Sequence, residues 1–409
     1  MKKDHRILAV VFMFSFITGS CDIIGTGDTP PTPVKLNYKA AEIIEADQQF
    51  AFELFSEVNA LSEEENIMIS PLSVSYALGM TYNGAAGTTQ DAFEEVLHFE
   101  GLTKQEVNES YKDLMGQLVT LDKQVEFSIA NSIWYRLGAS VLDSFINTNR
   151  EYFDAAVEEL DFSDPASVDV INDWIEEKTN DKIRDMLDQI PPGVYMYLVN
   201  AIYFNAEWKY TFDKDDTFTG DFHLEGGGTE AVDYMKIEQS FGYALQEDYA
   251  AVELPYGDSA FSMVAILPSE EIPVDSFIAM YGQEEWSRLG SLSGTQKMIV
   301  ELPKFKYEFK SLLNDPLTGL GLGVAFSDAA DFSGITTETD LYISRVIHQT
   351  FIDVNEKGTE ATAATIMEMR ETSALMNYIR FDRPFVYIIK ENSTGAILFM
   401  GKVGRPVYE

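Results

Sequence analysis

Apolar and polar residues recur along the chain in two periods, and these periods predict both helices and strands. Apolar residues at three- and four-residue spacing indicate amphipathic helices. These predicted helices are Ile43–Val58, Leu72–Tyr82, Val168–Thr179 and Gln283–Leu289. Runs rich in β-branched and aromatic residues predict strands. These predicted strands are Tyr197–Phe204, Ser262–Leu267, Met298–Leu302 and Tyr342–Val354.

The order of these elements indicates the fold class. Helices and strands are mixed without regular alternation, which favours an α+β fold over a doubly wound sheet. The composition stays globular over residues 40–409, with no linker and no internal repeat. The chain has 409 residues, of which 45% are hydrophobic, so it can bury a large core. We therefore predict one domain over 40–409.

The N-terminus has the pattern of a targeting segment. Lys2, Lys3 and Arg6 supply positive charge, and an almost unbroken apolar run follows over Ile7–Ile17. This run is too short to span a bilayer as a stable helix. We predict a signal peptide over residues 1–21, which excludes this segment from the fold.

Cys21 is the only cysteine in the chain, and it stands where a bacterial lipoprotein is cleaved and acylated. Thr18 replaces the Leu that is usual in such signals, so an ordinary secretion signal is the alternative. Residues 22–39 are rich in Gly, Thr and Pro, as expected of a flexible linker. We expect a lipid anchor at Cys21 and a place at the cell envelope or surface, or otherwise a periplasmic or extracellular protein. A single cysteine allows no internal disulfide.

The charge of the chain excludes one class of partner. The formal net charge is -38, from 67 acidic and 29 basic residues. Such a surface repels phosphate backbones and anionic lipid headgroups, so we expect neither nucleic-acid binding nor direct membrane binding. Acidity of this kind is typical of a solvated surface, and a basic partner is the alternative.

Catalytic motifs are missing from the sequence. The four histidines are His5, His98, His223 and His348, and no two of them stand at metal-ligand spacing. The sequence contains neither a Gly-x-Ser-x-Gly elbow nor a phosphate-binding Gly-Lys-Ser/Thr loop. We therefore predict no enzymatic activity, no cofactor and no metal.

A segment near the C-terminus differs from the rest of the chain. At the strand period, one face carries Thr359, Ala361, Ala363 and Thr365, and the other carries Glu360, Thr362, Ala364 and Ile366. All side chains on the first face are small, so this segment could enter a sheet as a strand without overpacking the core beneath it. The 21 residues from Thr359 to Ile379 contain no turn signal. Loops of that length in compact domains are usually functional or disordered.

Motifs spread over nearly the whole domain resemble the serpin family of serine protease inhibitors. They are Asn66–Ser73, Gly84–Thr89, Val199–Trp208, Phe326–Gly334, Asn355–Ala361, Phe381–Phe385, Leu398–Val403 and Pro406. The resemblance implies the serpin fold, with three β-sheets, about eight or nine helices and an exposed reactive-centre loop. It also implies a monomer that acts on a target serine protease.

The resemblance further implies a mechanism. A protease attacks the loop as a substrate, and after acylation the freed loop inserts into the central sheet as a new strand. The acylated protease is thereby carried to the far pole, where its active site is deformed and deacylation stalls. Insertion of about 14 residues at about 3.3 Å each moves the enzyme by about 45 Å.

The loop must insert before the acyl-enzyme hydrolyses, and the hinge residues control this. By resemblance the hinge comprises Glu356, Gly358, Thr359, Glu360, Ala361, Thr362, Ala363 and Ala364. Its inward face has no bulky, charged or Pro residue, and Thr362, where Ala is commoner in the family, falls on the outward face. The sequence therefore favours an inhibitor. The alternative is a non-inhibitory surface or ligand-binding protein with the same fold.

The position of the attacked bond follows from counting along the family pattern. Counting forward from Glu356 gives Thr372–Ser373, and counting back from Phe381 gives one bond later. We predict Thr372–Ser373, which suits elastase-like or subtilisin-like proteases because Thr372 is small and β-branched. A trypsin-like enzyme cutting at Arg370–Glu371 is the alternative, as is a loop cut at several bonds.

Two further regions are assigned by the resemblance. His348 aligns with the histidine of the family's shutter, near Ser70, Ser73 and Asn200, where the central sheet must part. Trp208 falls in the breach, where the hinge first enters the sheet. These residues are expected to control sheet opening, and we expect no metal-binding or general-base role for His348.

Overall fold

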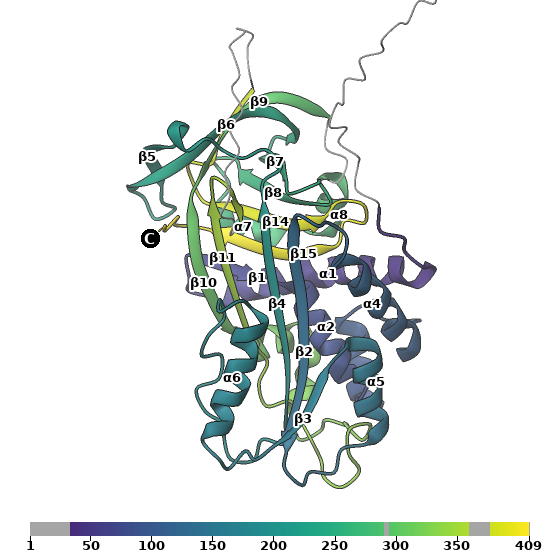
Figure 1. The fold of residues 1–409 in the computed structure, drawn as a ribbon. Helices are drawn as coiled ribbons and strands as arrows, with labels where there is room; N and C mark the ends of the chain where they lie inside the picture. The colour runs from purple at the N-terminus through teal and green to yellow at the C-terminus, as the bar shows by residue number, and fades with distance from the viewer. Residues whose placement is uncertain (1–32, 290–293, 360–376, 409) are drawn as a thin grey trace, which may run out of the picture.

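The computed structural model describes residues 33–289, 294–359 and 377–408, which form nine α-helices and two β-sheets (Figure 1). The helices are α1 (Tyr38–Leu61), α2 (Pro71–Tyr82), α3 (Gly87–Val96), α4 (Lys104–Leu118), α5 (Asp143–Phe153), α6 (Ala166–Lys178), α7 (Val274–Met280), α8 (Gln283–Leu289) and α9 (Asn314–Gly319). Two short 3-10 helices are η1 (Lys214–Asp216) and η2 (Leu322–Phe326). The fold class is therefore α+β, as the sequence predicts.

The first sheet has six strands in the order β10, β11, β12, β4, β2, β3. Their bounds are β2 (Val125–Arg136), β3 (Ala156–Leu160), β4 (Met196–Glu207), β10 (Phe305–Leu312), β11 (Ile347–Asn355) and β12 (Gly358–Thr359). We call this the central sheet. In Figure 1 its long strands run through the height of the molecule.

The second sheet has nine strands in the order β1, β15, β14, β8, β7, β6, β9, β13, with β5 paired to β6. Their bounds are β1 (Asn66–Ile69), β5 (Phe218–His223), β6 (Thr229–Leu245), β7 (Tyr249–Pro255), β8 (Phe261–Pro268), β9 (Thr295–Pro303), β13 (Asn377–Arg380), β14 (Phe385–Glu391) and β15 (Ile397–Val403). The three sheets implied by the resemblance are connected here as two. The connection is β6, which pairs with β5 and β9 and then, through its last residues, with β7.

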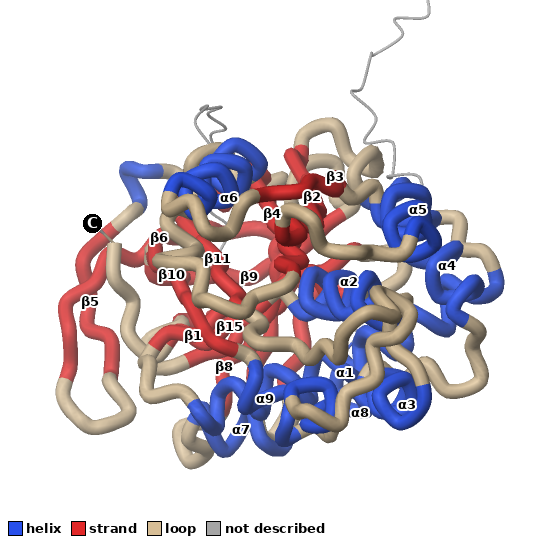
Figure 2. The backbone as a smooth tube through the Cα atoms, turned by 90° about the horizontal axis from the view of Figure 1, so that it is seen from below, coloured by secondary structure: helices blue, strands red, loops and turns tan. Residues whose placement is uncertain are grey.

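Helices cover both faces of the central sheet. Figure 2 shows α2 on one side of β4 and α6 on the other. Ile202, Phe204 and Ala206 of β4 belong to the main hydrophobic core. Val199 and Ala201 belong to a second cluster that α6 covers. Side chains of β4 therefore alternate strictly between an inner face toward α2 and an outer face toward α6.

Helix α2 is apolar almost all round, and nearly every one of its residues is buried. Its start is fixed by the sequence, since Ser70 is the N-cap and accepts a hydrogen bond from the Ser73 backbone N–H. Pro71 follows at the first helical position, where a missing N–H costs nothing. This cap places Ser70 and Ser73 directly under the central sheet.

One predicted strand boundary is wrong. The strand expected from Tyr342 begins only at Ile347. Near its start the Val346 N–H bonds the side chain of Asn314 at 2.9 Å instead of a neighbouring strand, so the ladder ends there. At the N-terminus of the fold, α1 begins at Tyr38. Val34 is also buried, and its N–H bonds Ser393 Oγ at 3.0 Å.

Candidate functional site

The candidate site is the junction between β4 and β11 in the middle of the central sheet. On its far edge, β11 pairs with β10 throughout, and β4 likewise pairs with β2 from Met196 to Ala206. On their facing edges the two strands are joined only through β12, whose two residues pair with both of them. Below β12, the described part of the chain provides no strand between β4 and β11. The sheet is therefore open over most of this junction.

Thr359 closes the upper end of the junction. It pairs with Val354 of β11 and Ala206 of β4, and its side chain is buried. Its Oγ1 lies 2.7 Å from the hydroxyl of Tyr256, and this hydrogen bond is buried. Burial raises the pKa of Tyr256 well above its ordinary value, so the phenol stays neutral. The side chain of Thr359 thus already faces inward in the intact chain.

Trp208 supports this contact from the side. Its ring stacks on Tyr256 at a centroid distance of 4.4 Å and an interplanar angle of 10°. Its indole Nε1–H donates to the Asn355 carbonyl oxygen at 2.9 Å, and its backbone N–H donates to the Lys357 carbonyl oxygen at 2.8 Å. Trp208 therefore holds the turn between β11 and β12 against β4.

Gly358 and Glu356 fix the same turn. A Cβ at Gly358 would overlap the Ala206 backbone, so only glycine allows this close approach. The buried Glu356 carboxylate lies 3.2 Å from Lys304 Nζ and accepts a hydrogen bond from Thr217 at 3.0 Å. Burial acts to raise the pKa of Glu356, but its hydrogen bonds and the Lys304 charge outweigh burial and hold the pKa below its ordinary value.

A chain of buried hydrogen bonds crosses the junction near its middle. The Ser70 backbone N–H donates to His348 Nε2 at 3.0 Å, and Ser70 Oγ donates to the Leu398 carbonyl oxygen at 2.7 Å. Ser73 Oγ donates to the side-chain oxygen of Asn200. Asn200 in turn donates to Asn131 Oδ1 at 2.7 Å. The chain ties β11, the start of α2, β4 and β2 together, so parting β4 from β11 disturbs a shared polar network.

His348 is neutral in this network. It is buried, and burial lowers its pKa from 6.5 to about 4. Its Nε2 accepts the Ser70 N–H, so this nitrogen carries no proton. Among the described residues, no group of three or more His, Cys, Asp or Glu side chains is arranged to hold a metal ion. The geometry assigns His348 to packing and hydrogen bonding within the sheet.

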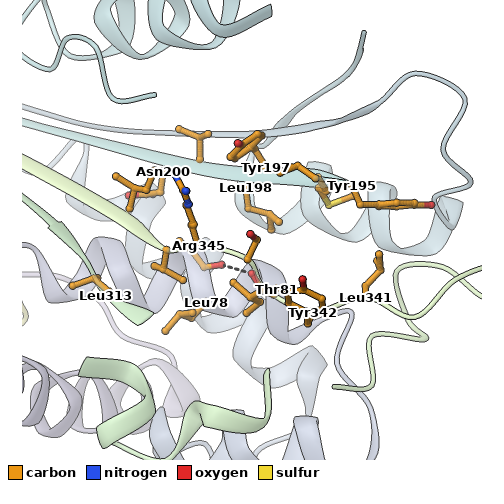
Figure 3. A pocket seen from close by; sticks show the side chains of 18 of the residues that line it. Leu78, Thr81, Tyr195, Tyr197, Leu198, Asn200, Leu313, Leu341, Tyr342 and Arg345 are labelled. Carbon is orange, nitrogen blue, oxygen red and sulfur yellow. Dashed lines mark hydrogen bonds between the residues drawn. The ribbon is translucent and has the colours of Figure 1, made fainter. Parts of the chain in front are cut away.

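The lower end of the junction is a cavity of about 290 Å³. Figure 3 shows its walls, with Tyr197, Leu198 and Asn200 of β4 on one side and Leu341, Tyr342 and Arg345 of the segment before β11 on the other. Leu78 and Thr81 of α2 form the floor. The cavity is thus part of the same opening as the unpaired strand edges.

None of the helices in the described ranges has both the length and the apolar character of a membrane span.

An opening of this kind, closed at one end by a glycine–threonine hinge, is what the serpin motifs imply. A sequence model described as Serpin (serine protease inhibitor) matches residues 45–406. The chain belongs to the serpin family. Members of this family are generally protease inhibitors rather than catalysts, and they generally pair with target proteases.

Relatives and solved structures of serpins match over most of their length. An uncharacterized serpin-like protein from Methanosarcina acetivorans is 34% identical over 375 residues, which cover 90% of this chain and 87% of the relative. Human neuroserpin is 30% identical over 377 residues, covering 88% of this chain and 91% of neuroserpin. The crystal structure of the thermophilic serpin tengpin in the native state gives a TM-score of 0.83 at 32% identity and covers 92% of this chain and 97% of tengpin.

The structure brings together the residues that the resemblance assigned to shutter and breach. Ser70, Ser73, Asn200 and His348 lie in one hydrogen-bonded chain, and Trp208 lies beside the entering hinge. Of the hinge, Glu356, Gly358 and Thr359 are described. Outside the described residues lie Glu360, Ala361, Thr362, Ala363, Ala364, both candidate bonds (Thr372–Ser373 and Arg370–Glu371) and Cys21.

Sequence reasoning missed three supporting contacts. Tyr256 bonds Thr359 across 103 positions of sequence, and no spacing rule connects residues so far apart. Lys304 and Thr217 likewise reach Glu356 only in three dimensions. A buried polar residue always needs a partner, so the hinge glutamate was the signal that could have prompted a search for a lysine.

His348 should make stability depend on pH. Its pKa is about 4 in the folded chain and 6.5 ordinarily, so the unfolded chain takes up this proton first as the pH falls. The stability that His348 contributes is complete above pH 6.5. It is lost as the pH falls to 4, by up to about 3 kcal/mol. We expect His348→Gln, which keeps an acceptor, to flatten this decline in urea unfolding measured across that pH range.

His98 provides the matched control. Its hydrogen bond to Glu53, 3.0 Å long, raises its pKa, so its contribution is present at low pH and is lost as the pH rises. His98→Gln should therefore change the pH dependence of stability in the direction opposite to that of His348→Gln. Parallel profiles for the wild-type and His348→Gln chains would contradict the role assigned to His348.

Proposed function

We propose that this serpin is an inhibitor that traps a serine protease covalently by inserting its cleaved loop into the central sheet. The observation that carries this proposal is the open junction between β4 and β11, joined only by Gly358 and Thr359. Both facing edges carry backbone N–H and C=O groups that a new strand could pair with. Insertion would complete the ladder and bury the strand between the two helical layers.

The register of β12 fixes where later loop residues would lie. It runs antiparallel to both neighbours, so each further loop residue lies opposite the preceding residue of β11 and of β4. Ala361 would lie opposite Ile352 and Phe204, which belong to the main core. Ala363 would lie opposite Ile202 on the same inner face. Small side chains suit these positions because the neighbouring core residues already fill the space.

The same register brings the next inward residue to the buried network. Thr365 would lie opposite His348 and Asn200, which bond Ser70 and Ser73 in the intact chain. Its hydroxyl can both donate and accept a hydrogen bond. Insertion would therefore place a polar side chain beside His348 and Asn200, which are themselves polar.

The proposed target is a protease with a shallow apolar specificity pocket. Thr372 precedes the predicted bond at Thr372–Ser373, and a small β-branched residue suits an elastase-like or subtilisin-like enzyme. A trypsin-like enzyme that cuts Arg370–Glu371 is the second candidate for the same mechanism. Either cut would leave at least eleven loop residues after Thr359 free to insert.

A non-inhibitory binding protein is the alternative function, and two observations favour it. Human thyroxine-binding globulin, solved in complex with its ligand, gives a TM-score of 0.81 at 28% identity and covers 90% of this chain. The cavity of about 290 Å³ is lined by apolar and aromatic residues together with polar ones such as Thr81, Asn200 and Arg345. Under this alternative the cavity would hold a ligand and the loop would not insert.

We also propose that the protein is secreted and anchored through lipid at Cys21, which would hold it at the cell envelope or surface. The support is the signal-like pattern of residues 1–21 and the position of the only cysteine at its end. An anchored inhibitor could protect envelope proteins from proteases that come from outside the cell. A secreted form without the lipid is the alternative.

Replacing one inward hinge residue should separate cleavage from trapping. The wild-type chain should form a complex with subtilisin or elastase that survives denaturing electrophoresis. Ala361→Arg would bury an unpaired charge on insertion, and a penalty of about 3 kcal/mol would slow this step by about 100-fold. This variant should be cut at the normal rate and release active protease.

Glu360→Arg is the matched control, because the register places residue 360 on the outer face beside Asn205 and Asp353. It carries the same new side chain and should still trap protease. Equal trapping by both variants would refute insertion in this register. A wild-type chain that forms no complex with serine proteases of either specificity, and gains no thermal stability on loop cleavage, would favour the non-inhibitory alternative.

The attacked bond can be read from the fragment that cleavage releases. Mass spectrometry of the C-terminal fragment should give a new N-terminus at Ser373, or within one or two residues of it. A fragment that starts at Glu371 would indicate a trypsin-like target. Cleavage only outside Met367–Leu375 would show that the family register does not apply to this loop.

Lipidation can be tested in cells that make the full chain. The wild-type protein should incorporate labelled fatty acid and partition into the detergent phase, and Cys21→Ser should abolish both. Cys21→Ser should leave protease trapping by the purified domain unchanged, since the fold begins after this residue. Recovery of the wild-type protein in soluble, unlabelled form would exclude the anchor.

A further inference from the structure

The cavity at the lower end of the junction has the size and the wall of a ligand site. Its volume is about 290 Å³. A cavity of about 150 Å³ holds a molecule of benzene, so this one has room for about ten to twelve non-hydrogen atoms. Apolar side chains form much of its wall, among them Val74, Leu78, Leu198, Leu313, Ile335 and Ile343. Such a wall suits the apolar body of a small molecule.

Arg345 brings a positive charge to this cavity. It lines the cavity from the segment just before β11, and it is exposed. In Figure 3 its side chain lies in the gap between this segment and β4. It forms neither an ion pair nor a hydrogen bond with any other residue that the structure describes. In a chain with a net charge of -38, a cation without an acidic partner keeps its charge available for a ligand.

Tyr197 lies across this gap from Arg345 and offers a second hydrogen-bond donor (Figure 3). Both residues line the cavity, and both also line a neighbouring one of about 250 Å³, so they share the boundary between the two. The hydroxyl of Tyr197 makes no hydrogen bond within the described part of the chain. Burial raises the pKa of Tyr197, and the nearby charge of Arg345 only partly offsets this rise. The phenol therefore stays a neutral donor.

Asp340 and His348 are the remaining acidic or basic residues of the wall, and neither competes with Arg345. His348 is neutral, and its Nε2 accepts the Ser70 N–H. Asp340 is exposed and adjoins Leu341, which Figure 3 shows on the other side of the cavity from Arg345. The negative charge of Asp340 disfavours an anionic group at its own end. A bound anion would therefore place its charge at the Arg345 end.

We infer that this cavity binds a small carboxylate with an apolar body, such as a medium-chain fatty acid. The carboxylate would accept hydrogen bonds from the Arg345 guanidinium and the Tyr197 hydroxyl. The apolar body would lie between Leu78 of α2 and Leu198 of β4. All four residues belong to the intact fold, so the inference does not rest on loop insertion. It applies to an inhibitor as well as to the non-inhibitory alternative.

The lining favours a carboxylate over an uncharged or a cationic group of the same size. Hydrogen bonds to an ionised group are about twice as strong as those between neutral groups, and the arginine fork matches both oxygens of a carboxylate. The apolar wall limits the access of water, which strengthens this attraction. An ammonium group would instead meet Arg345 as a like charge.

Octanoate is a suitable probe because it has about ten non-hydrogen atoms, as the cavity volume requires. Isothermal titration calorimetry of the purified intact protein should show one octanoate bound per chain. Octan-1-ol should bind about tenfold more weakly, because it offers no anion to Arg345. Octylammonium should bind more weakly still.

Substitutions at the Arg345 end test recognition of the carboxylate. Arg345→Gln should raise the Kd for octanoate about tenfold and leave that for octan-1-ol unchanged, and Arg345→Lys should recover part of the loss. Tyr197→Phe should raise the Kd for octanoate about threefold. Asp340→Asn is the matched control, since it removes a charge from the other end of the same wall and should not weaken octanoate binding.

Leu198→Trp tests the apolar end, because the larger side chain would fill space that the ligand needs. This variant should keep the circular dichroism spectrum of the wild type and lose octanoate binding. If it impairs folding, the Arg345 variants still decide the question, because Arg345 is exposed and its replacement leaves the core intact.

Three results would overturn the inference. The first is the absence of saturable octanoate binding. The second is equal affinity of the wild type and Arg345→Gln for octanoate, which would show that no cation recognises the ligand. The third is octanoate binding by a folded Leu198→Trp chain, which would place the ligand elsewhere on the protein. Protease trapping is measured separately, so failure of this site and failure of the proposed inhibition are distinguishable.

Discussion

The structure depends on one missing set of contacts, the hydrogen bonds that would join β4 to β11. Two long strands lie in the same sheet, each paired along nearly all of its far edge, and within the described residues only the two of β12 connect them. Unpaired strand edges inside a sheet are unfavourable and tend to capture another strand. The two strands therefore face each other across edges that carry backbone donors and acceptors available to a further strand.

Two features hold these two strands in place. At the top, Tyr256 and Trp208 hold Thr359 between the strands. In the middle, a buried network through Ser70 and His348 links the strands to α2. Each bond in such a network stabilises its neighbours, so the sheet opens only when several of them rearrange together. These contacts therefore oppose further separation of β4 from β11.

The sequence predicted the fold class and several elements well, and the reasons are local. Gln283–Leu289 was placed correctly because Trp286 and Leu289 recur at helical spacing and are buried. The strand over Tyr342–Val354 was too long, because periodicity does not reveal that the neighbour of Val346 is a side chain of Asn314. Family resemblance assigned residues to the shutter and breach, but the partners of Thr359 and Glu356 come from distant positions that no local pattern joins.

The docking of Val34 limits how far an anchored form could reach. Its backbone is bonded to Ser393, and the next backbone N–H, that of Lys35, is bonded to Gln117 at 2.8 Å. Only the twelve residues between Cys21 and Val34 would then separate a lipid from the folded body. Twelve residues, fully extended, span about 40 Å. In a lipid-anchored form, Val34 would therefore stay within about that distance of the membrane, and the position of Val34 on the fold would decide which side of the domain faces the lipid.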